Sequence, residues 1–152
     1  MKKITGNIYQ LERAKIGNSY AIISDDNEIT LIDTGMPTKL VSIEAELIES
    51  NFKIENIKRI IITHNHIDHT GNVNKIKEKV GVEIVSHEYE KPYLEKSKKF
   101  SYSTISRKLL WSITNLLMKP HKINVNVTVI DGDNINGLEV IRFCIVSISL
   151  SS

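Results

Sequence analysis

The chain has 152 residues, of which 41% are hydrophobic and 25% charged, a composition that indicates a globular protein and argues against disorder. This length suits a single domain, and a formal net charge of +2 is too small to favour nucleic acid as a partner. The basic start at Met1–Lys3 is not followed by the apolar run of a signal peptide, and no stretch reaches the roughly 18 apolar residues that span a bilayer. We therefore expect a cytoplasmic protein that does not contact a membrane.

The first third of the chain is predicted to form a β-meander. Short aliphatic runs occur at residues 7–11, 19–23 and 29–32, and the polar turn Asp25–Glu28 separates the last two. The third run ends at Asp33-Thr34-Gly35. We expect three strands whose aliphatic side chains are buried and whose connections are polar.

A helical period follows the meander. Apolar side chains recur three and four positions apart between Thr38 and Ser50, at Leu40, Ile43, Leu47 and Ile48. Thr38 comes directly after Pro37 and is the expected N-cap. The spacing predicts a helix that directs these four apolar side chains toward the core.

Strands and helices then alternate along the chain. Residues 58–63 are expected to form a short, mostly apolar strand, and residues 72–80 a helix that ends at Gly81. Another short strand is expected at residues 82–85. This alternation indicates an α/β fold.

The C-terminal third begins with an amphipathic segment between Ser103 and Met118. Its apolar residues fall on one helical face, at Ile105, Leu109, Ile113, Leu116 and Leu117. We interpret it as a helix packed on the core, and the alternatives are a lid over a substrate pocket or a helix on a membrane surface. Further strands are expected at residues 125–130 and 138–141, on either side of a turn at residues 131–134.

The residues with the clearest chemistry are His64, His66, Asp68 and His69. Three of the five histidines of the chain and one carboxylate fall within this short string, and both side-chain types are zinc ligands. Residues two apart in an extended segment face the same side, so His64 and His66 could bind one ion together. Asp68 and His69 could bind a second ion about 3.5–4 Å from the first.

The position of this string along the chain also favours a site. It follows the aliphatic run Ile60–Ile62, and the active sites of α/β folds gather at the carboxyl ends of strands. Gly71 allows the backbone a tight path just after the string. The alternative interpretation is a polar loop that is rich in histidine by chance.

The segment His64-Asn65-His66-Ile67-Asp68-His69 matches the H-x-H-x-D-H signature of the metallo-β-lactamase superfamily, which the chain therefore resembles. Asn18–Tyr20 and Leu31–Gly35 are similar to the N-terminal meander of that family, in which the aspartate lies close to the metal site. His87–Leu94 resembles the segment that often follows the strand after the metal helix, and Asp131–Ile141 resembles the hairpin before the third-histidine loop. The resemblance covers nearly the whole chain.

This resemblance implies the N-terminal αβ unit of an αββα sandwich and the start of its second unit. It implies a hydrolase in which His64 and His66 bind one zinc ion and Asp68 and His69 bind a second, and iron or manganese are also compatible with it. A metal-bound hydroxide would attack an ester, thioester, lactone or phosphoester in a small-molecule substrate. Asp68 would orient that hydroxide or handle its proton.

The chain departs from the family pattern after Ile141. The family completes its site with a histidine in a loop resembling T-P-G-H-T, a bridging aspartate and a final histidine, whereas the tail Arg142–Ser152 offers only the thiol of Cys144. We therefore divide the chain into an incomplete domain over residues 1–141 and an aberrant tail over residues 142–152, as expected from a truncated or frameshifted gene. The competing class of function is a non-catalytic chain that binds metal weakly, or binds a partner through an uncovered sheet.

Three side chains outside the string were considered as ligands. His87 is expected in a loop at the start of a helix near the site, and His121 is expected to be an exposed loop residue. Cys144 is the single cysteine, which excludes a disulfide within the chain, and such a residue is more often a small core side chain than a ligand.

Overall fold

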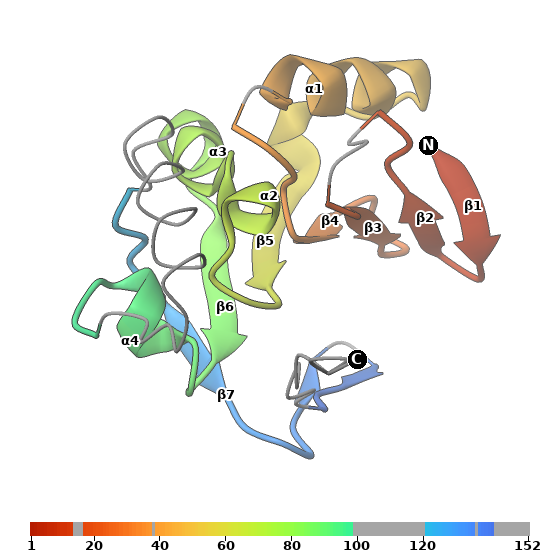
Figure 1. Ribbon diagram of the computed structural model, residues 1–152. Helices are drawn as coiled ribbons and strands as arrows, with labels where there is room; N and C mark the ends of the chain where they lie inside the picture. The colour runs from red at the N-terminus through yellow and green to blue at the C-terminus, as the bar shows by residue number, and fades with distance from the viewer. Residues whose placement is uncertain (14–16, 38, 99–120, 136, 142–152) are drawn as a thin grey trace, which may run out of the picture.

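The computed structural model describes residues 1–13, 17–37, 39–98, 121–135 and 137–141. The strands in these ranges are β1 (Lys2–Thr5), β2 (Ile8–Gln10), β3 (Tyr20–Ile23), β4 (Ile29–Ile32), β5 (Ile57–Ile62), β6 (Glu83–His87), β7 (Val127–Val129), β8 (Asn134–Ile135) and β9 (Leu138–Glu139). The helices are α1 (Leu40–Glu49), the short 3-10 helix η1 (Ile54–Asn56), α2 (Ile67–Thr70), α3 (Val73–Val80) and α4 (Lys91–Leu94). Figure 1 shows β1 to β7 side by side in one sheet and the β8–β9 hairpin set apart from it.

The large sheet changes from antiparallel to parallel pairing at β4. Its strand order is β1-β2-β3-β4-β5-β6-β7, with antiparallel pairs from β1 to β4 and parallel pairs from β4 to β7. Parallel neighbours need crossover connections, and here these carry α1 between β4 and β5, and α2 and α3 between β5 and β6. The carboxyl ends of β4, β5 and β6 therefore meet at one edge of the sheet.

The hydrophobic core lies between the sheet and the helices α1 and α3. Successive strand residues point to opposite faces, and one set of alternate residues faces the helices. The strands contribute Ile29, Leu31, Ile60, Ile62 and Ile84 to this cluster, and the helices contribute Ile43, Leu47, Val73 and Ile76. Burial of one such side chain stabilises the fold by about 1.5–3 kcal/mol relative to exposure. This packing fixes the strands whose ends carry the chemistry described below.

The other face of the sheet has a mixed character. Ile32 and Ile61, which alternate with core positions and are neighbours across β4 and β5, are half-buried. On the same face, Arg59 of β5 donates from Nε to the Oε2 atom of Glu83 in β6 over 2.6 Å. The face thus combines aliphatic side chains with an ion pair between neighbouring strands.

Most of the predicted elements are confirmed close to their expected bounds. The three strands of the meander are β2, β3 and β4, and the two predicted helices before residue 81 are α1 and α3. Gly81 ends α3 as expected, because it adopts a left-handed φ of 70° and donates its N–H to the carbonyl of Lys77. The mixed α/β fold inferred from the sequence is therefore present.

Three details of the first half differ from the expectation. Strand β1 was not predicted, because all of its residues are exposed and no alternation of burial marks it; pairing with β2 holds it in the sheet. Ile48 was expected on the inner side of α1 but is 66% exposed, while Leu47 is fully buried. The N-cap of α1 is Lys39, which makes no side-chain capping hydrogen bond, and Thr38 lies outside the described residues.

Two further expectations concern the C-terminal third. The predicted helix at Ser103–Met118 and the tail Arg142–Ser152, with Cys144, lie outside the described residues. In the ranges that the structure describes, no helix is both long and apolar enough to cross a bilayer.

Candidate metal centre

The histidine string lies at the carboxyl end of β5, where the chain passes into α2. His66 is the N-cap of α2, and its backbone N–H donates to the carbonyl of His64 over 2.9 Å, which closes a tight turn around Asn65. Thr70 donates to the carbonyl of His66 from both its N–H and its hydroxyl, each over 2.9 Å. The string is thus a turn and one helical turn rather than the extended segment assumed from the sequence.

The imidazole of His64 lies in contact with the imidazoles of His66 and His69. The ring centroids of His64 and His66 are 4.5 Å apart, and those of His64 and His69 are 4.0 Å apart. Asp68 joins them, with its Oδ2 atom 3.4 Å from Nε2 of His69. The structure therefore brings together all four residues that the sequence singled out, with the His64 ring in contact with each of the other two rings.

The chemistry of these donors fits zinc, which binds imidazole nitrogen and carboxylate oxygen. Their arrangement fits it only in part. Within the described ranges, no three His, Cys, Asp or Glu side chains are placed so that they could hold one ion as they stand. The described residues therefore do not form a complete three-ligand set, and the pairing of His64 with His66 and of Asp68 with His69 on two ions stays a prediction.

Asp33 fixes the orientation of His69 from the end of β4. Its buried carboxylate lies 2.7 Å from Nδ1 of His69 and accepts hydrogen bonds from the N–H of Thr63 over 2.9 Å and from its hydroxyl over 2.6 Å. An Nδ1–H directed at a carboxylate leaves Nε2 as the ligand atom, the arrangement common around metal-binding histidines. Asp33 reaches this position with a left-handed φ of 58°. Among non-glycine residues, Asp and Asn adopt this conformation more readily than most.

His64 and His69 have pKa values shifted in opposite directions. The pKa of His69 is raised, mainly by its hydrogen bond to Asp33, and the charges of Asp33 and Asp68 add to this effect while burial opposes it. The pKa of His64 is lowered, first by burial and then by His69 and His66, against the opposing charges of Asp33 and Asp68. A neutral imidazole is the form that binds metal, so the low pKa of His64 favours ligation at neutral pH.

The backbone after β4 is hydrogen-bonded to the backbone after α2. Thr34 donates to the carbonyl of His69 from its N–H over 2.7 Å and from its hydroxyl over 3.1 Å. The fully buried Asn72 donates from Nδ2 to the carbonyls of Thr34 and Met36, each over 2.7 Å. These bonds hold the loop with Asp33 against the helix with His69.

Two glycines permit close backbone approaches around the string. A Cβ atom on Gly71 would lie 2.3 Å from the nitrogen of Pro37, so the expectation of a tight path there is confirmed. Gly17, which the sequence analysis did not single out, has a φ of +77°, and a Cβ atom there would lie 2.1 Å from the carbonyl oxygen of Asp68. Only glycine lets the loop after β2 pass this close to α2.

Glu90 is a second residue that the sequence analysis missed. Its Oε2 atom accepts a hydrogen bond from the N–H of Asn65 over 2.9 Å. A glutamate in the polar segment Glu88-Tyr89-Glu90-Lys91 carries no spacing signal, so only the fold could show that it reaches the string.

Of the other two histidines, His121 lies in an exposed loop as expected, whereas His87 belongs to strand β6 and not to the expected loop at the start of a helix. His87 is the last residue of β6 and follows Ser86, which pairs with Ile62 of β5. Its Nε2 atom lies 3.7 Å from Oδ1 of Asp131. His121 is exposed and lies outside helices and strands.

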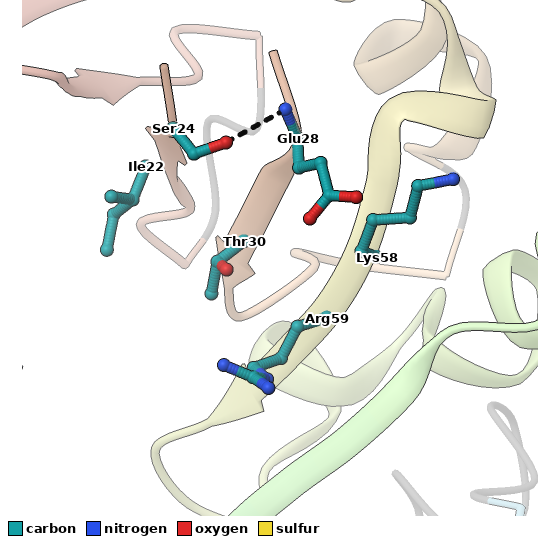
Figure 2. Close-up of a pocket in the computed structure, with 6 residues that line it drawn as sticks. All are labelled: Ile22, Ser24, Glu28, Thr30, Lys58 and Arg59. Carbon is teal, nitrogen blue, oxygen red and sulfur yellow. Dashed lines mark hydrogen bonds between the residues drawn. The ribbon is translucent and has the colours of Figure 1, made fainter. Parts of the chain in front are cut away.

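A small hollow of about 100 Å³ lies near the start of β5, away from the carboxyl end of that strand (Figure 2). Its lining residues are Ile22, Ser24, Glu28, Thr30, Lys58 and Arg59. Lys58 and Arg59 stand near the start of β5, whereas the histidine string follows its end. The hollow is therefore separate from the candidate metal centre.

Comparison with known proteins identifies the family. The sequence profile described as "Metallo-beta-lactamase superfamily" matches residues 13–143, and the chain belongs to this superfamily. Membership supports a metal-dependent hydrolase.

Individual relatives agree with this assignment. The "Probable metallo-hydrolase YqjP" of Bacillus subtilis is 26% identical over 56% of this chain and 27% of its own length. The subclass B3 metallo-beta-lactamase BJP-1 of Bradyrhizobium japonicum superposes with a TM-score of 0.67 and 27% identity over 88% of this chain and 46% of its own. The class B3 di-zinc metallo-beta-lactamase LRA-12 from an Alaskan soil metagenome gives a TM-score of 0.67 and 20% identity over the same shares of 88% and 46%. The chain thus spans less than half the length of each of these proteins.

Proposed function

We propose that the chain carries the first metal-binding segment of a zinc-dependent hydrolase, within a domain that spans residues 1–141 and precedes a separate tail at 142–152. The observation that carries the proposal is the contact among His64, His66 and His69 at the carboxyl end of β5, with Asp33 orienting His69. Superfamily membership supports hydrolysis, and the similarity to LRA-12, a di-zinc enzyme, supports zinc as the metal.

Each residue of the string has a proposed role. His64 and His66 would hold one zinc ion, and Asp68 and His69 a second. When bound, zinc supplies Lewis-acid activation of water and of the electrophilic group of the substrate. Asp68, whose side chain is 33% exposed, is placed to hold or move a proton at Oδ2 beside the imidazole of His69. Asp33 keeps the His69 ring in one orientation.

The proposed substrates are small molecules with an electrophilic carbonyl or phosphoryl centre. Esters, thioesters, lactones and phosphoesters share this feature and all suit activation by a Lewis acid. We propose a cytoplasmic location for the reaction, and we propose neither nucleic acid nor a membrane as a partner.

One observation favours a non-catalytic alternative. Catalytic zinc normally keeps three protein ligands, and no such set is arranged for one ion within the described ranges. A chain with ligands only in pairs would bind zinc weakly without turnover. It could instead bind a partner through the mixed sheet face of Ile32, Ile61 and the Arg59–Glu83 pair.

The test is hydrolysis of a panel of chromogenic esters, thioesters, lactones and phosphoesters by the full chain. We expect turnover that is lost after chelation, restored by zinc, and abolished in His66→Ala. The matched control is His121→Ala, which removes an exposed histidine far along the chain from the string. Zinc uptake without turnover on any substrate would favour the non-catalytic alternative, and turnover that persists in His66→Ala would contradict the proposed site.

A further inference from the structure

The carboxylate of Glu90 is bonded to the middle of the histidine string from a separate part of the chain. Glu90 precedes α4, and its Oε2 atom accepts the N–H of Asn65 over 2.9 Å in a partly buried position, across 25 residues of sequence. Asn65 is the central residue of the turn that the His66 N–H closes on the carbonyl of His64. The bond therefore acts on the residue between two candidate ligands.

The backbone of Glu90 is itself firmly held. Its N–H donates to the carbonyl of His87 over 3.0 Å, and its carbonyl accepts the N–H of Leu94 over 3.0 Å. His87 ends β6, a strand in the interior of the sheet, and Leu94 is a buried core residue. The backbone that carries this carboxylate is held by hydrogen bonds on both sides. The carboxylate can therefore restrain the position of the turn around Asn65.

The side chain of Glu90 does not cap the helix α4 that it precedes. Glu90 is the N-cap of α4, yet that helix has no side-chain capping hydrogen bond. The carboxylate is directed to Asn65 instead. The sequence separation of 25 residues shows that this bond joins two separate segments, so it restrains the turn of the string and not the helix α4.

We propose that Glu90 is a positioning residue for the metal-binding turn. A hydrogen bond from a backbone N–H to a carboxylate is charge-assisted and stronger than a neutral one. Here it fixes the orientation of the Asn65 peptide, and with it the direction in which His64 and His66 leave the turn. Glu90 would thereby hold the two imidazoles in the relative positions that one ion needs. This inference rests on the proposed metal-binding function of the string.

The test separates the reach of the side chain from its charge. Glu90→Gln keeps an acceptor oxygen at the same reach without the charge, whereas Glu90→Asp keeps the charge and shortens the reach by one methylene. Glu88→Asp is the matched control, since Glu88 is exposed in the same loop. Zinc affinity of the full chain is measured by competition with a chromophoric chelator. Amide hydrogen exchange of Asn65 is measured by NMR on the metal-free chain.

We expect Glu90→Asp to weaken zinc binding about 10–100-fold, the usual effect of removing a partner that orients metal ligands. It should also speed exchange of the Asn65 amide. Glu90→Gln, which keeps an acceptor at the same reach but loses the charge assistance, should show a smaller change than Glu90→Asp in both readouts, and Glu88→Asp should change neither. The opposite ranking, with affinity lost in Glu90→Gln and kept in Glu90→Asp, would overturn the proposal because charge and not reach would then matter. Unchanged Asn65 exchange in Glu90→Asp would also overturn it.

Failure of the metal proposal gives a different result. If the wild-type chain takes up no zinc but Asn65 exchange still depends on the reach of residue 90, the anchoring of the turn stands and the assigned metal function does not.

Discussion

Nδ1 of His69 lies 2.7 Å from Oδ2 of Asp33, although 36 residues separate them in the sequence. Asp33 follows β4 and His69 lies in α2, after β5, so the contact exists only because parallel pairing brings the ends of β4 and β5 to one edge of the sheet. The same carboxylate accepts two hydrogen bonds from Thr63. Asp33 therefore connects the end of one strand to the beginning of the candidate metal centre.

The first prediction concerns this contact. Asp33→Asn keeps an oxygen for Thr63 and tolerates the left-handed backbone, but it weakens the bond that orients His69. We expect zinc affinity to fall about 10–100-fold, as measured by competition with a chromophoric chelator. The matched control is Asp26→Asn in the exposed turn before β4, which should leave affinity unchanged. An equal effect of the two substitutions would contradict a specific role for Asp33.

The second prediction concerns the close approach at Gly71. A Cβ atom there would lie 2.3 Å from the nitrogen of Pro37, and backbone on both sides leaves little room to adjust. We expect Gly71→Ala to lower the free energy of unfolding by about 2–3 kcal/mol, the upper part of the range for overpacking. The measurement is urea denaturation followed by circular dichroism.

Gly81→Ala provides the comparison for Gly71→Ala. Gly81 has a φ of +70°, but a Cβ atom there meets nothing within 4 Å. Its substitution should cost only the conformational strain of the left-handed backbone, about 1–2 kcal/mol. A larger loss of unfolding free energy in Gly81→Ala than in Gly71→Ala would contradict this prediction, because it would mean that the loop at Pro37 moves to accommodate the added methyl group.

The third prediction uses neighbouring residues of α1 that differ in burial. Leu47 is fully buried, whereas Ile48 is 66% exposed. We expect Leu47→Ala to lower the free energy of unfolding by about 2–5 kcal/mol, and Ile48→Ala to change it by no more than about 0.5 kcal/mol. Chemical denaturation of both variants under one set of conditions checks the orientation of the helix, and similar costs at the two positions would contradict it.

The fourth prediction is a pH dependence at Glu95. The pKa of Glu95 is lowered, mainly by its bond to Lys91; burial opposes this shift, and the N–H of Val125 and the charges of Lys91 and Lys122 add to it. A lowered folded-state pKa means that this stabilisation is present above the unfolded value and is lost as the pH falls through the folded value. Glu95→Gln should therefore be less stable than wild type at pH 7, by less than about 1 kcal/mol for so accessible a pair.

This difference should disappear in acid. The difference should shrink as the pH falls through the lowered folded-state pKa of Glu95, because the wild-type carboxyl becomes protonated there, and well below that pKa the two proteins should unfold at the same denaturant concentration. A difference that persists unchanged well below that pKa would mean that the carboxylate charge is not its source.

The candidate site was predictable from the sequence where its residues are close together. His64, His66, Asp68 and His69 combine ligand chemistry with a short spacing, and the aliphatic strand before them indicates the edge of the sheet at which they lie. Neither feature depends on distant contacts. The structure confirms that all three rings and the carboxylate gather at the end of β5.

The partners of the string were predictable only in part. Asp33 could be placed near the site through the family pattern, but its bond to Nδ1 of His69 depends on the register of β4 and β5. Glu90 and Gly17 gave no signal, because one is a charged residue in a polar loop and the other a glycine whose constraint is a distant carbonyl. Such contacts arise from the pairing of separate segments, which a local pattern does not encode.

The fold shows the same division. The strands of the meander and the helix α3 follow from periodicity, because alternate burial leaves alternate apolar residues. Strand β1 is exposed throughout, so its sequence shows no such pattern. Its backbone forms a strand because it pairs with β2. Ile48 continues the helical spacing of α1 but falls just past the edge of its buried stripe.

The central claim is that the string at the end of β5 is a metal site. The most direct measurement is the zinc content of the purified full chain, by elemental analysis after dialysis against trace zinc, in wild type and in His66→Ala. We predict bound zinc in the wild type and its loss in the variant, with His121→Ala retaining the wild-type amount. Equal zinc in wild type and His66→Ala, or none in the wild type, would contradict the claim.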